Sequence, residues 1–202
     1  MNYSNLFKCG LYNTKLLPYT KPIINIVNVV ATASTNQKLD LYKIQKKFPH
    51  VEYNPEQFPG AVFRIKIPKA SILIFRTGNM VCTGTKSEDM AKKAVKLAVQ
   101  QLRKKGIKIK KAPVVAVQNI VASINLGGRI HLEQAARTLP RSMYEPEQFP
   151  GLIHRMIHPK VVLLIFFTGK CVCAGAKSEN DVFHSVNNLH SMLEEKGLMD
   201  YG

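Results

Sequence analysis

The stretch Tyr53-Asn-Pro-Glu-Gln-Phe-Pro-Gly60 recurs as Tyr144-Glu-Pro-Glu-Gln-Phe-Pro-Gly151, 91 positions further along the 202-residue chain. Other identical residues have the same separation: Asn28 and Asn119, Arg64 and Arg155, Phe75 and Phe166, Lys86 and Lys177. A constant separation without insertion or deletion predicts two copies of one fold related by a pseudo-twofold axis. We therefore expect an N-terminal extension over 1–22, a first repeat over 23–112 and a second repeat over 113–202.

Each copy has the pattern of an α+β fold. After a first strand and a short helix, each copy continues with a meander of three strands separated by breakers such as Pro68 and Gly78. A long helix closes the copy, with Ser87 as the N-cap residue in the first copy and a capping box from Ser178 to Asp181 in the second. The expected strands are 23–33, 61–67, 70–76, 79–85 and 114–124.

Two strand sequences, Ser71–Phe75 and Val161–Phe166, are apolar at nearly every position. Because successive side chains of a strand point to opposite faces, these strands present two apolar faces, and one layer of helices covers only one of them. The face left over contains Leu73, Phe75, Val162, Leu164 and Phe166. A sandwich core or a dimer interface would be the ordinary explanation of such a face.

Basic residues surround this second face, and they favour a different explanation. The members of this rim are Arg64, Lys86, Arg155, Lys170 and Lys177. A ligand that is apolar inside and anionic at its edges suits such a surface. The minor groove of DNA, with sugar walls and phosphate edges, has this character.

The charge of the chain also favours nucleic acid. The net charge is +16 and the pI is near 9.8, so that nucleic acid or an anionic membrane surface is the first partner to consider. The excess lies in residues 1–112, since residues 113–202 contain equal numbers of basic and acidic side chains. The longest apolar run, Val161–Phe167, is too short to span a membrane, and residues 1–22 resemble a poorly ordered extension rather than a secretory signal.

The sequence has no pattern typical of a catalytic, metal or nucleotide site. Cys171 and Cys173 share one face of a strand, a spacing that suits neither a disulfide nor a zinc knuckle, and we expect all four cysteines to be free thiols. The six histidines lack metal-ligand spacing, and Gly78–Ser87 has the wrong spacing for a phosphate-binding loop. We therefore expect no enzymatic activity, no metal, no cofactor and no small-molecule substrate.

With these motifs the chain resembles the TATA-box-binding proteins over residues 23–198. The resemblance is carried by Gln118–Val121, Tyr144–Gly151, Arg155, Pro159-Lys160, the Ile-Phe-x-x-Gly turns, and Gly-x-Lys at 84–86 and 175–177. It implies a saddle: two tandem pseudo-symmetric repeats forming a curved antiparallel sheet with helices on the convex face. The Gln-Phe-Pro-Gly sequence in both repeats is similar to that of archaeal members, which implies a location in the cytoplasm beside the nucleoid, or in the nucleus if the source is eukaryotic.

The resemblance assigns roles to residues on the concave face. It implies that Asn28 and Asn119 hydrogen-bond to A·T pairs and that the cationic rim contacts phosphates. The implied wedges that enter base steps are Phe58, Phe75, Phe149 and Phe166. The implied apolar floor consists of Val30, Leu73, Val81, Thr83, Val121, Leu164, Val172 and Ala174. Two residues depart from the family pattern: Ala174 replaces a threonine and Asn79 replaces a lysine.

The function implied is that of a general transcription factor that binds and bends the TATA box and nucleates preinitiation complex assembly. Its implied partners are promoter DNA, a transcription factor IIB-type protein bound through Glu145 and Glu147, and RNA polymerase through that protein. Two alternatives are a divergent relative that acts as a protein scaffold without TATA preference, and an enzyme domain, which would need catalytic segments that the remaining residues do not supply. The basic run Lys92–Lys105 is either a solvated helix face or a docking surface for regulators.

Overall fold

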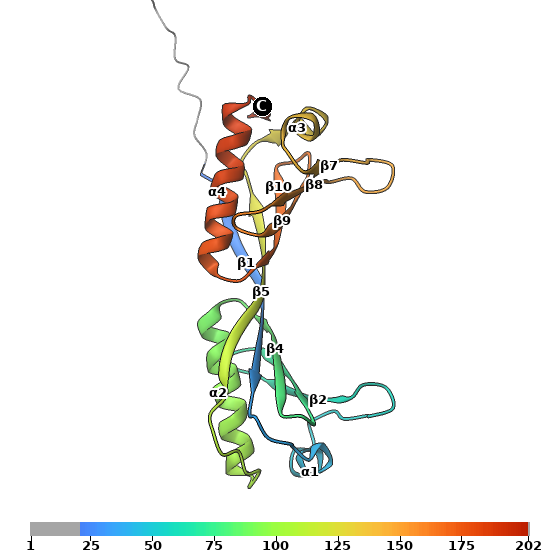
Figure 1. Cartoon of the computed structure of the whole chain (residues 1–202), viewed down its shortest axis with the longest axis vertical. Helices are drawn as coiled ribbons and strands as arrows, with labels where there is room; N and C mark the ends of the chain where they lie inside the picture. The colour runs from blue at the N-terminus through green and yellow to red at the C-terminus, as the bar shows by residue number, and fades with distance from the viewer. Residues whose placement is uncertain (1–20, 202) are drawn as a thin grey trace, which may run out of the picture.

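The structure, a computed structural model, describes residues 21–201 as two similar lobes arranged along one long axis (Figure 1). The first repeat contains β1 (Ile23–Ser34), α1 (Leu41–Lys47), β2 (Gly60–Ile65), β3 (Ala70–Phe75), β4 (Asn79–Thr85) and α2 (Glu88–Lys104). The second contains β5 (Val114–Asn125), β6 (Arg129–Ile130), α3 (Leu132–Thr138), β7 (Ser142–Met143), β8 (Leu152–Met156), β9 (Val161–Ile165), β10 (Lys170–Ala176), α4 (Glu179–Glu195) and β11 (Met199–Asp200). Most of the expected extension, residues 1–20, lies outside the described residues.

The strands of the two repeats form one antiparallel sheet whose centre is the pair β1 and β5. Within the described residues this sheet has nine strands in the order β2-β3-β4-β1-β5-β10-β9-β8-β7. Val29 pairs with Ile120 at its centre, flanked by the pairs Asn28 with Val121 and Val30 with Asn119. Val29 and Ile120 are themselves 91 positions apart, so the pseudo-twofold axis passes between them. The predicted fold class, α+β with two pseudo-symmetric repeats, is confirmed.

The helices cover one face of this sheet, as the doubly apolar strands required. Ile72, Ile74, Leu163 and Ile165 are fully buried beneath the helix layer, whereas the alternate positions of β3 and β9 are only partly buried. In Figure 1, α2 and α4 lie on the left of the sheet, and the loops before β2 and β8 project to the right. One face of the sheet therefore packs in the core and the other remains accessible between the projecting loops.

The long helices begin at the predicted caps. The Ser87 hydroxyl accepts a hydrogen bond from the Met90 N–H at 3.1 Å, and Ser178 and Asp181 form the complete capping box. Such caps satisfy N–H groups that the first turn leaves without partners inside the helix. The predicted apolar stripe of α2 is confirmed, since its buried residues are Ala91, Ala94, Val95, Ala98, Val99 and Leu102.

The N-termini of α2 and α4 meet at the pseudo-twofold axis and cap each other. The Glu88 N–H donates to the Glu179 carboxylate at 3.1 Å, and the Glu179 N–H donates to the Glu88 carboxylate at 3.1 Å. Each carboxylate therefore lies at the positive end of the other repeat's helix dipole. These two hydrogen bonds connect the helices of the two repeats, and the pairing of β1 with β5 connects their sheets.

Sequence patterns did not predict the short strands β6, β7 and β11. Met199 pairs with Ile130 across β11 and β6. The first repeat has no such strand pair among its described residues, and the side chain of Gln37 makes backbone hydrogen bonds there instead. There Gln37 Nε2 donates to the Lys108 carbonyl, and Gln37 Oε1 accepts from the Lys110 N–H at 3.0 Å. A primary amide offers the same donor and acceptor as a peptide group, so Gln37 replaces one rung of a strand pair.

The cysteines that the structure describes, Cys82, Cys171 and Cys173, are buried free thiols. Burial raises the pKa of the Cys82 thiol to about 11, and it raises the pKa values of the other two thiols as well. The thiolate is the reactive form of cysteine. These residues therefore behave as small core side chains.

We expect Glu88→Ala to lower the free energy of unfolding by about 1 kcal/mol, because it removes the acceptor of the Glu179 N–H. Chemical denaturation measures this difference. Asp89→Ala is the matched control, since it removes the same charge from the same helical turn, and it should cost only a few tenths of a kcal/mol. Equal losses in the two variants would contradict a stabilising role for the exchanged caps.

Candidate nucleic-acid interface

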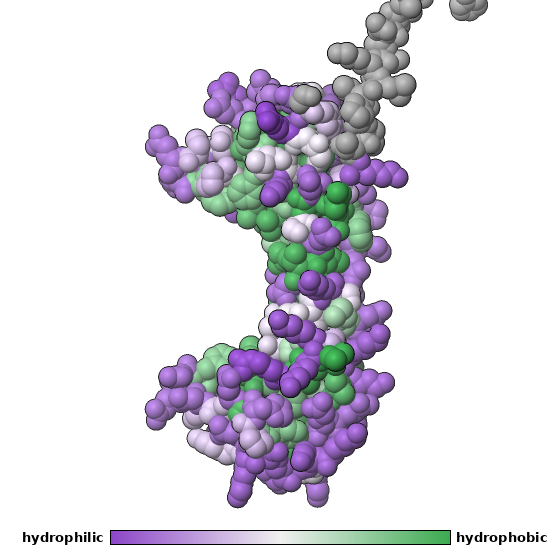
Figure 2. All heavy atoms as spheres, turned by 180° about the vertical axis from the view of Figure 1, so that it is seen from behind, coloured by the Kyte–Doolittle hydropathy of each residue, from purple (hydrophilic) through white to green (hydrophobic). Residues whose placement is uncertain are grey.

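The accessible face of the sheet is hollow and apolar along the middle of the molecule. Figure 2 shows groups of apolar side chains on both sides of the middle of the waist, with hydrophilic side chains between them and on the outer surfaces. The predicted floor residues are all partly buried on this concave face: Val30, Leu73, Val81, Thr83, Val121, Leu164, Val172 and Ala174. Leu73 lies directly opposite Val81, and Leu164 lies directly opposite Val172. The structure therefore brings the predicted floor residues of both repeats together.

A pair of phenylalanine rings lies in the outer part of each half of the sheet. Phe58 precedes β2 and Phe75 ends β3, and their ring centroids are 5.8 Å apart at 64°. Phe149 and Phe166 have the same arrangement in the second repeat, at 5.8 Å and 63°. This edge-to-face geometry is favourable for aromatic pairs. Both pairs are accessible in part, with Phe58 39% exposed.

Gly60 and Gly151, which end the repeated motifs, make room for these rings. A Cβ atom on Gly60 would lie 2.7 Å from Phe58 Cε1, and a Cβ atom on Gly151 would lie 2.7 Å from Phe149 Cε1. These distances are shorter than carbon atoms tolerate. Glycine at the end of the repeated Gln-Phe-Pro-Gly sequence is therefore required sterically, because any larger residue there would displace a phenylalanine ring.

The two concave asparagines are held by backbone N–H groups. Asn28 Oδ1 accepts from the Gly84 N–H at 2.9 Å, and Asn119 Oδ1 accepts from the Gly175 N–H at 2.9 Å. The donors are peptide nitrogens, so the acceptor in each amide must be the oxygen, and this fixes the orientation of both amides. The Nδ2 groups remain as donors on the concave face.

Glycine is required at the two donor positions. Gly84 and Gly175 have φ angles of +87° and +96°, which other residues adopt only with strain. Both interrupt regular pairing of their strands, since the register between β1 and β4 shifts near Gly84 and that between β5 and β10 shifts near Gly175. The sequence showed the repeated Gly-x-Lys motif but gave no signal of this positioning role.

The two asparagines differ in one hydrogen bond. The Thr83 hydroxyl donates to Asn28 Oδ1 at 3.3 Å, whereas Ala174, at the equivalent position, has no hydroxyl to offer Asn119. The Asn28 amide is therefore fixed by two donors and the Asn119 amide by one. Asn79, the other departure from the family pattern, is exposed at the start of β4.

The predicted rim residues Arg64, Lys86, Arg155, Lys170 and Lys177 are all exposed. Arg64 already has a partner, because its guanidinium forms an ion pair with the Glu52 carboxylate. The side chains of Arg64 and Glu52 are 54% and 66% exposed. Ion pairs as exposed as this one contribute little to the free energy of folding. An anionic ligand can therefore displace Glu52 at small cost.

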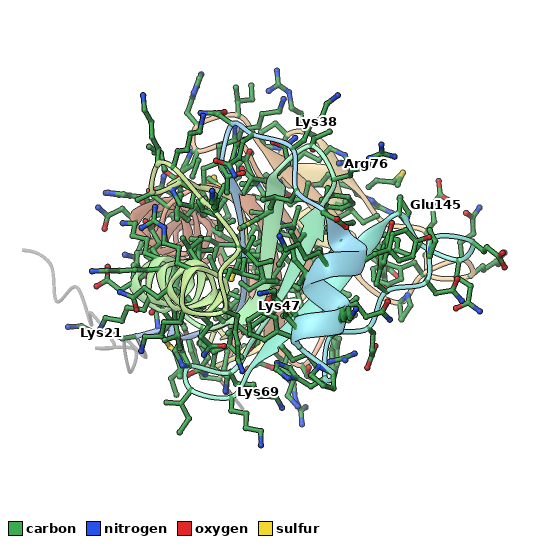
Figure 3. The ribbon with its side chains drawn as sticks, turned by 90° about the horizontal axis from the view of Figure 1, so that it is seen from below. Lys21, Lys38, Lys47, Lys69, Arg76 and Glu145 are labelled. Atoms are coloured by element: carbon green, nitrogen blue, oxygen red, sulfur yellow. The ribbon has the colours of Figure 1, made fainter. Side chains whose placement is uncertain are left out.

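Glu145 and Glu147 lie on the loop before β8. Both carboxylates are exposed, and the backbone turn is closed by the Phe149 N–H donating to the Glu145 carbonyl at 2.9 Å. Figure 3 shows Glu145 on a loop that extends away from the helices. The acidic side chains therefore lie on the same loop as Phe149.

The residues 21–201 contain no cluster of metal-ligating side chains and no helix able to cross a membrane. The concave face brings together the predicted floor residues, both asparagines and both phenylalanine pairs. It has an apolar floor, amide donors near its centre and an aromatic pair in each half, and the predicted rim cations are exposed.

A family model described as "Transcription factor TFIID (or TATA-binding protein, TBP)" matches residues 23–105 and 114–196. The TATA-box-binding protein of Pyrodictium occultum is 55% identical over 175 residues, covering 87% of this chain and 88% of its own. That of Sulfolobus acidocaldarius is 50% identical over 179 residues, covering 89% of this chain and 90% of its own. The solved structure of Methanococcus jannaschii TBP has a TM-score of 0.77 and 41% identity, and the match covers 85% of this chain and 98% of that one.

These matches agree with the duplicated motifs, the continuous sheet and the concave face. They confirm the resemblance to archaeal members and the expectation of a non-enzymatic protein. The chain belongs to the family of TATA-box-binding proteins.

Proposed function

We propose that this protein is a general transcription factor that binds the TATA box through the minor groove and bends it. The observation that carries the proposal is the pair of amides near the centre of the floor. Asn28 and Asn119 each use Oδ1 within the protein, which leaves amide donors for the acceptors N3 of adenine and O2 of thymine. A guanine amino group would bring a donor against these donors, so A·T pairs are preferred.

The shape and polarity of the surrounding surface support the same ligand. The apolar floor suits the sugar walls of an opened minor groove, and the exposed cations of the rim suit its phosphates. A globular protein partner would instead be expected to need a complementary bulge and few cations around it. DNA is therefore the ligand that uses every part of the face.

The phenylalanine pairs supply the bending. Each pair lies in the outer part of its half of the sheet, and its rings are fixed by a close-fitting glycine. Apolar side chains that enter a base step unstack it and kink the duplex, a device for which this family is well known. Two kinks fit the duplex to a curved sheet that a straight duplex touches only in part.

The alternative of a scaffold without TATA preference finds no support in the floor. Ala174 removes one hydroxyl and Asn79 one cation, but both asparagines and both aromatic pairs remain in place. These departures weaken individual contacts. They leave the mode of binding unchanged.

The double variant Phe149→Ala with Phe166→Ala should bend DNA less and bind it about a hundredfold more weakly, because unstacking costs a few kcal/mol and the empty gap no longer offsets it. Energy transfer between dyes at the two ends of a TATA duplex measures the bend. Phe183→Ala is the control, since Phe183 lies on α4 and is 43% exposed. An unchanged end-to-end distance in the double variant would show that these rings are not wedges.

We also propose that the loop before β8 binds a transcription factor IIB-type protein, which in turn recruits RNA polymerase. Glu145 and Glu147 are exposed, and DNA phosphates would repel both carboxylates. The equivalent loop of the first repeat has Asn54 and Glu56, one carboxylate fewer. Charge complementarity to a basic partner sets register and association rate, and it gives the two ends of the saddle different partners.

Glu145→Lys with Glu147→Lys should leave DNA binding intact or slightly stronger and should abolish the ternary complex with the IIB-type factor. Gel-shift titration on a TATA duplex measures both steps. The matched control is Asn54→Lys with Glu56→Lys, which places lysines on the equivalent loop of the first repeat. If the factor joins both variants at the same concentration, the assigned partner surface is incorrect.

A further inference from the structure

The convex side of the first repeat carries a second cationic surface, formed by α2 and the segment that follows it. From Lys92 to Lys111 the chain has nine basic residues and no acidic one. All nine are exposed: Lys92, Lys93, Lys96, Arg103, Lys104, Lys105, Lys108, Lys110 and Lys111. We call this set the convex basic patch. Among the described residues, none of the nine forms an ion pair with an acidic side chain.

This patch is separate from the cationic rim of the DNA interface. In Figure 1, α2 lies on the opposite side of the sheet from the projecting loops. Figure 3, seen from the first-repeat end, shows the same helix end-on and away from the loop that carries Glu145. A duplex held against the concave face therefore leaves the patch unoccupied.

The fold itself does not require these cations, as the second repeat shows. The equivalents of Lys92, Lys93 and Lys96 on α4 are Phe183, His184 and Asn187. The equivalents of Arg103 and Lys104 are Glu194 and Glu195. Two helices with the same buried stripe thus have outer faces of different charge. The like charges on α2 repel one another, and binding of an anionic partner would relieve this repulsion.

The patch also contains a groove. A hollow of about 330 Å³ lies between α2 and the returning chain, and Lys92, Lys96 and Arg103 line it beside Ala112 and Pro113. Arg103 is held there because its Nε donates to the Ile109 carbonyl at 3.0 Å. This bond uses one of five guanidinium donors, and the two terminal nitrogens remain available for an oxyanion.

The chemistry of the patch favours a phosphate backbone over an acidic protein. Protein interfaces depend on large apolar or aromatic anchors and contain few lysines. Large exposed hydrophobic side chains occur in other parts of the described chain, but none lies between Lys86 and Lys111. Binding to the backbone of DNA requires only closely spaced cations, and it gains free energy from the release of counterions.

We propose that the convex basic patch binds a second segment of duplex DNA, without sequence preference, while the concave face holds the first. The protein then bridges two duplexes. Binding of a second duplex goes beyond promoter recognition and uses different residues. The bridging proposal and the proposed TATA-box binding can therefore fail independently.

The test is two-colour binding of the full-length chain. The protein is first saturated with a short TATA duplex carrying a donor dye, and a G·C-rich duplex of 25 base pairs carrying an acceptor dye is then titrated. Energy transfer should report the second duplex. The variant Lys92→Gln/Lys96→Gln/Arg103→Gln should bind it at least about tenfold more weakly, and the slope of log affinity against log salt should flatten by about 2.7.

The matched control is Lys38→Gln/Lys43→Gln/Lys46→Gln, which removes three exposed cations at and before α1 in the same repeat. It should keep the second duplex within about twofold of the unaltered chain, since its cations lie outside the patch. Equal losses in both variants would show diffuse attraction by net charge and overturn the proposal. So would the absence of energy transfer, or a chain that binds polyglutamate at the patch but not the duplex. Failure of the TATA duplex to bind would instead contradict the proposed function. In that case, titration of the G·C-rich duplex alone would still show whether the convex basic patch binds DNA.

Discussion

The antiparallel pairing of β1 with β5 is the constraint on which the rest of the structure depends. With Val29 opposite Ile120, every residue of the first repeat acquires its equivalent across one axis. The register places Asn28 and Asn119 close to that axis, so both amides serve one continuous floor. It also brings the N-termini of α2 and α4 together, where Glu88 and Glu179 exchange caps. A slip of one residue would turn the asparagines into the core.

This symmetric frame supports two surfaces of different character. On the concave side the repeats are nearly equivalent, because a minor groove presents similar walls and edges to both halves. On the outside they diverge, since α2 is basic where α4 is neutral or acidic, and the loop with Glu145 and Glu147 has no fully acidic equivalent. The residues proposed to contact DNA are thus placed similarly in the two repeats, while residues available to other partners differ between them.

The sequence predicted the repeats, the long helices and a sheet with two apolar faces, because each leaves a periodic or duplicated pattern. The roles of the concave residues came from the resemblance to the family, and they stay predictions. It did not predict the function of Gly84 and Gly175, since a backbone N–H that orients an amide leaves no pattern of its own. The mutual capping by Glu88 and Glu179 also could not be predicted from the sequence, because it depends on the distance between two helices. Gln37, which replaces a strand rung, and the short strand β11 depend on tertiary contacts in the same way.

Amide donors on the concave face are proposed to read the minor groove. This recognition can be measured as affinity for three duplexes of equal length: an A·T box, the same box with inosine·cytosine pairs, and the same box with guanine·cytosine pairs. Inosine lacks the minor-groove amino group but resembles guanine in the major groove. We predict that the inosine duplex binds within a few-fold of the A·T box and that the guanine duplex loses about 1–3 kcal/mol per pair. Equally weak binding of the inosine and guanine duplexes would show that the asparagine amides do not read the minor groove.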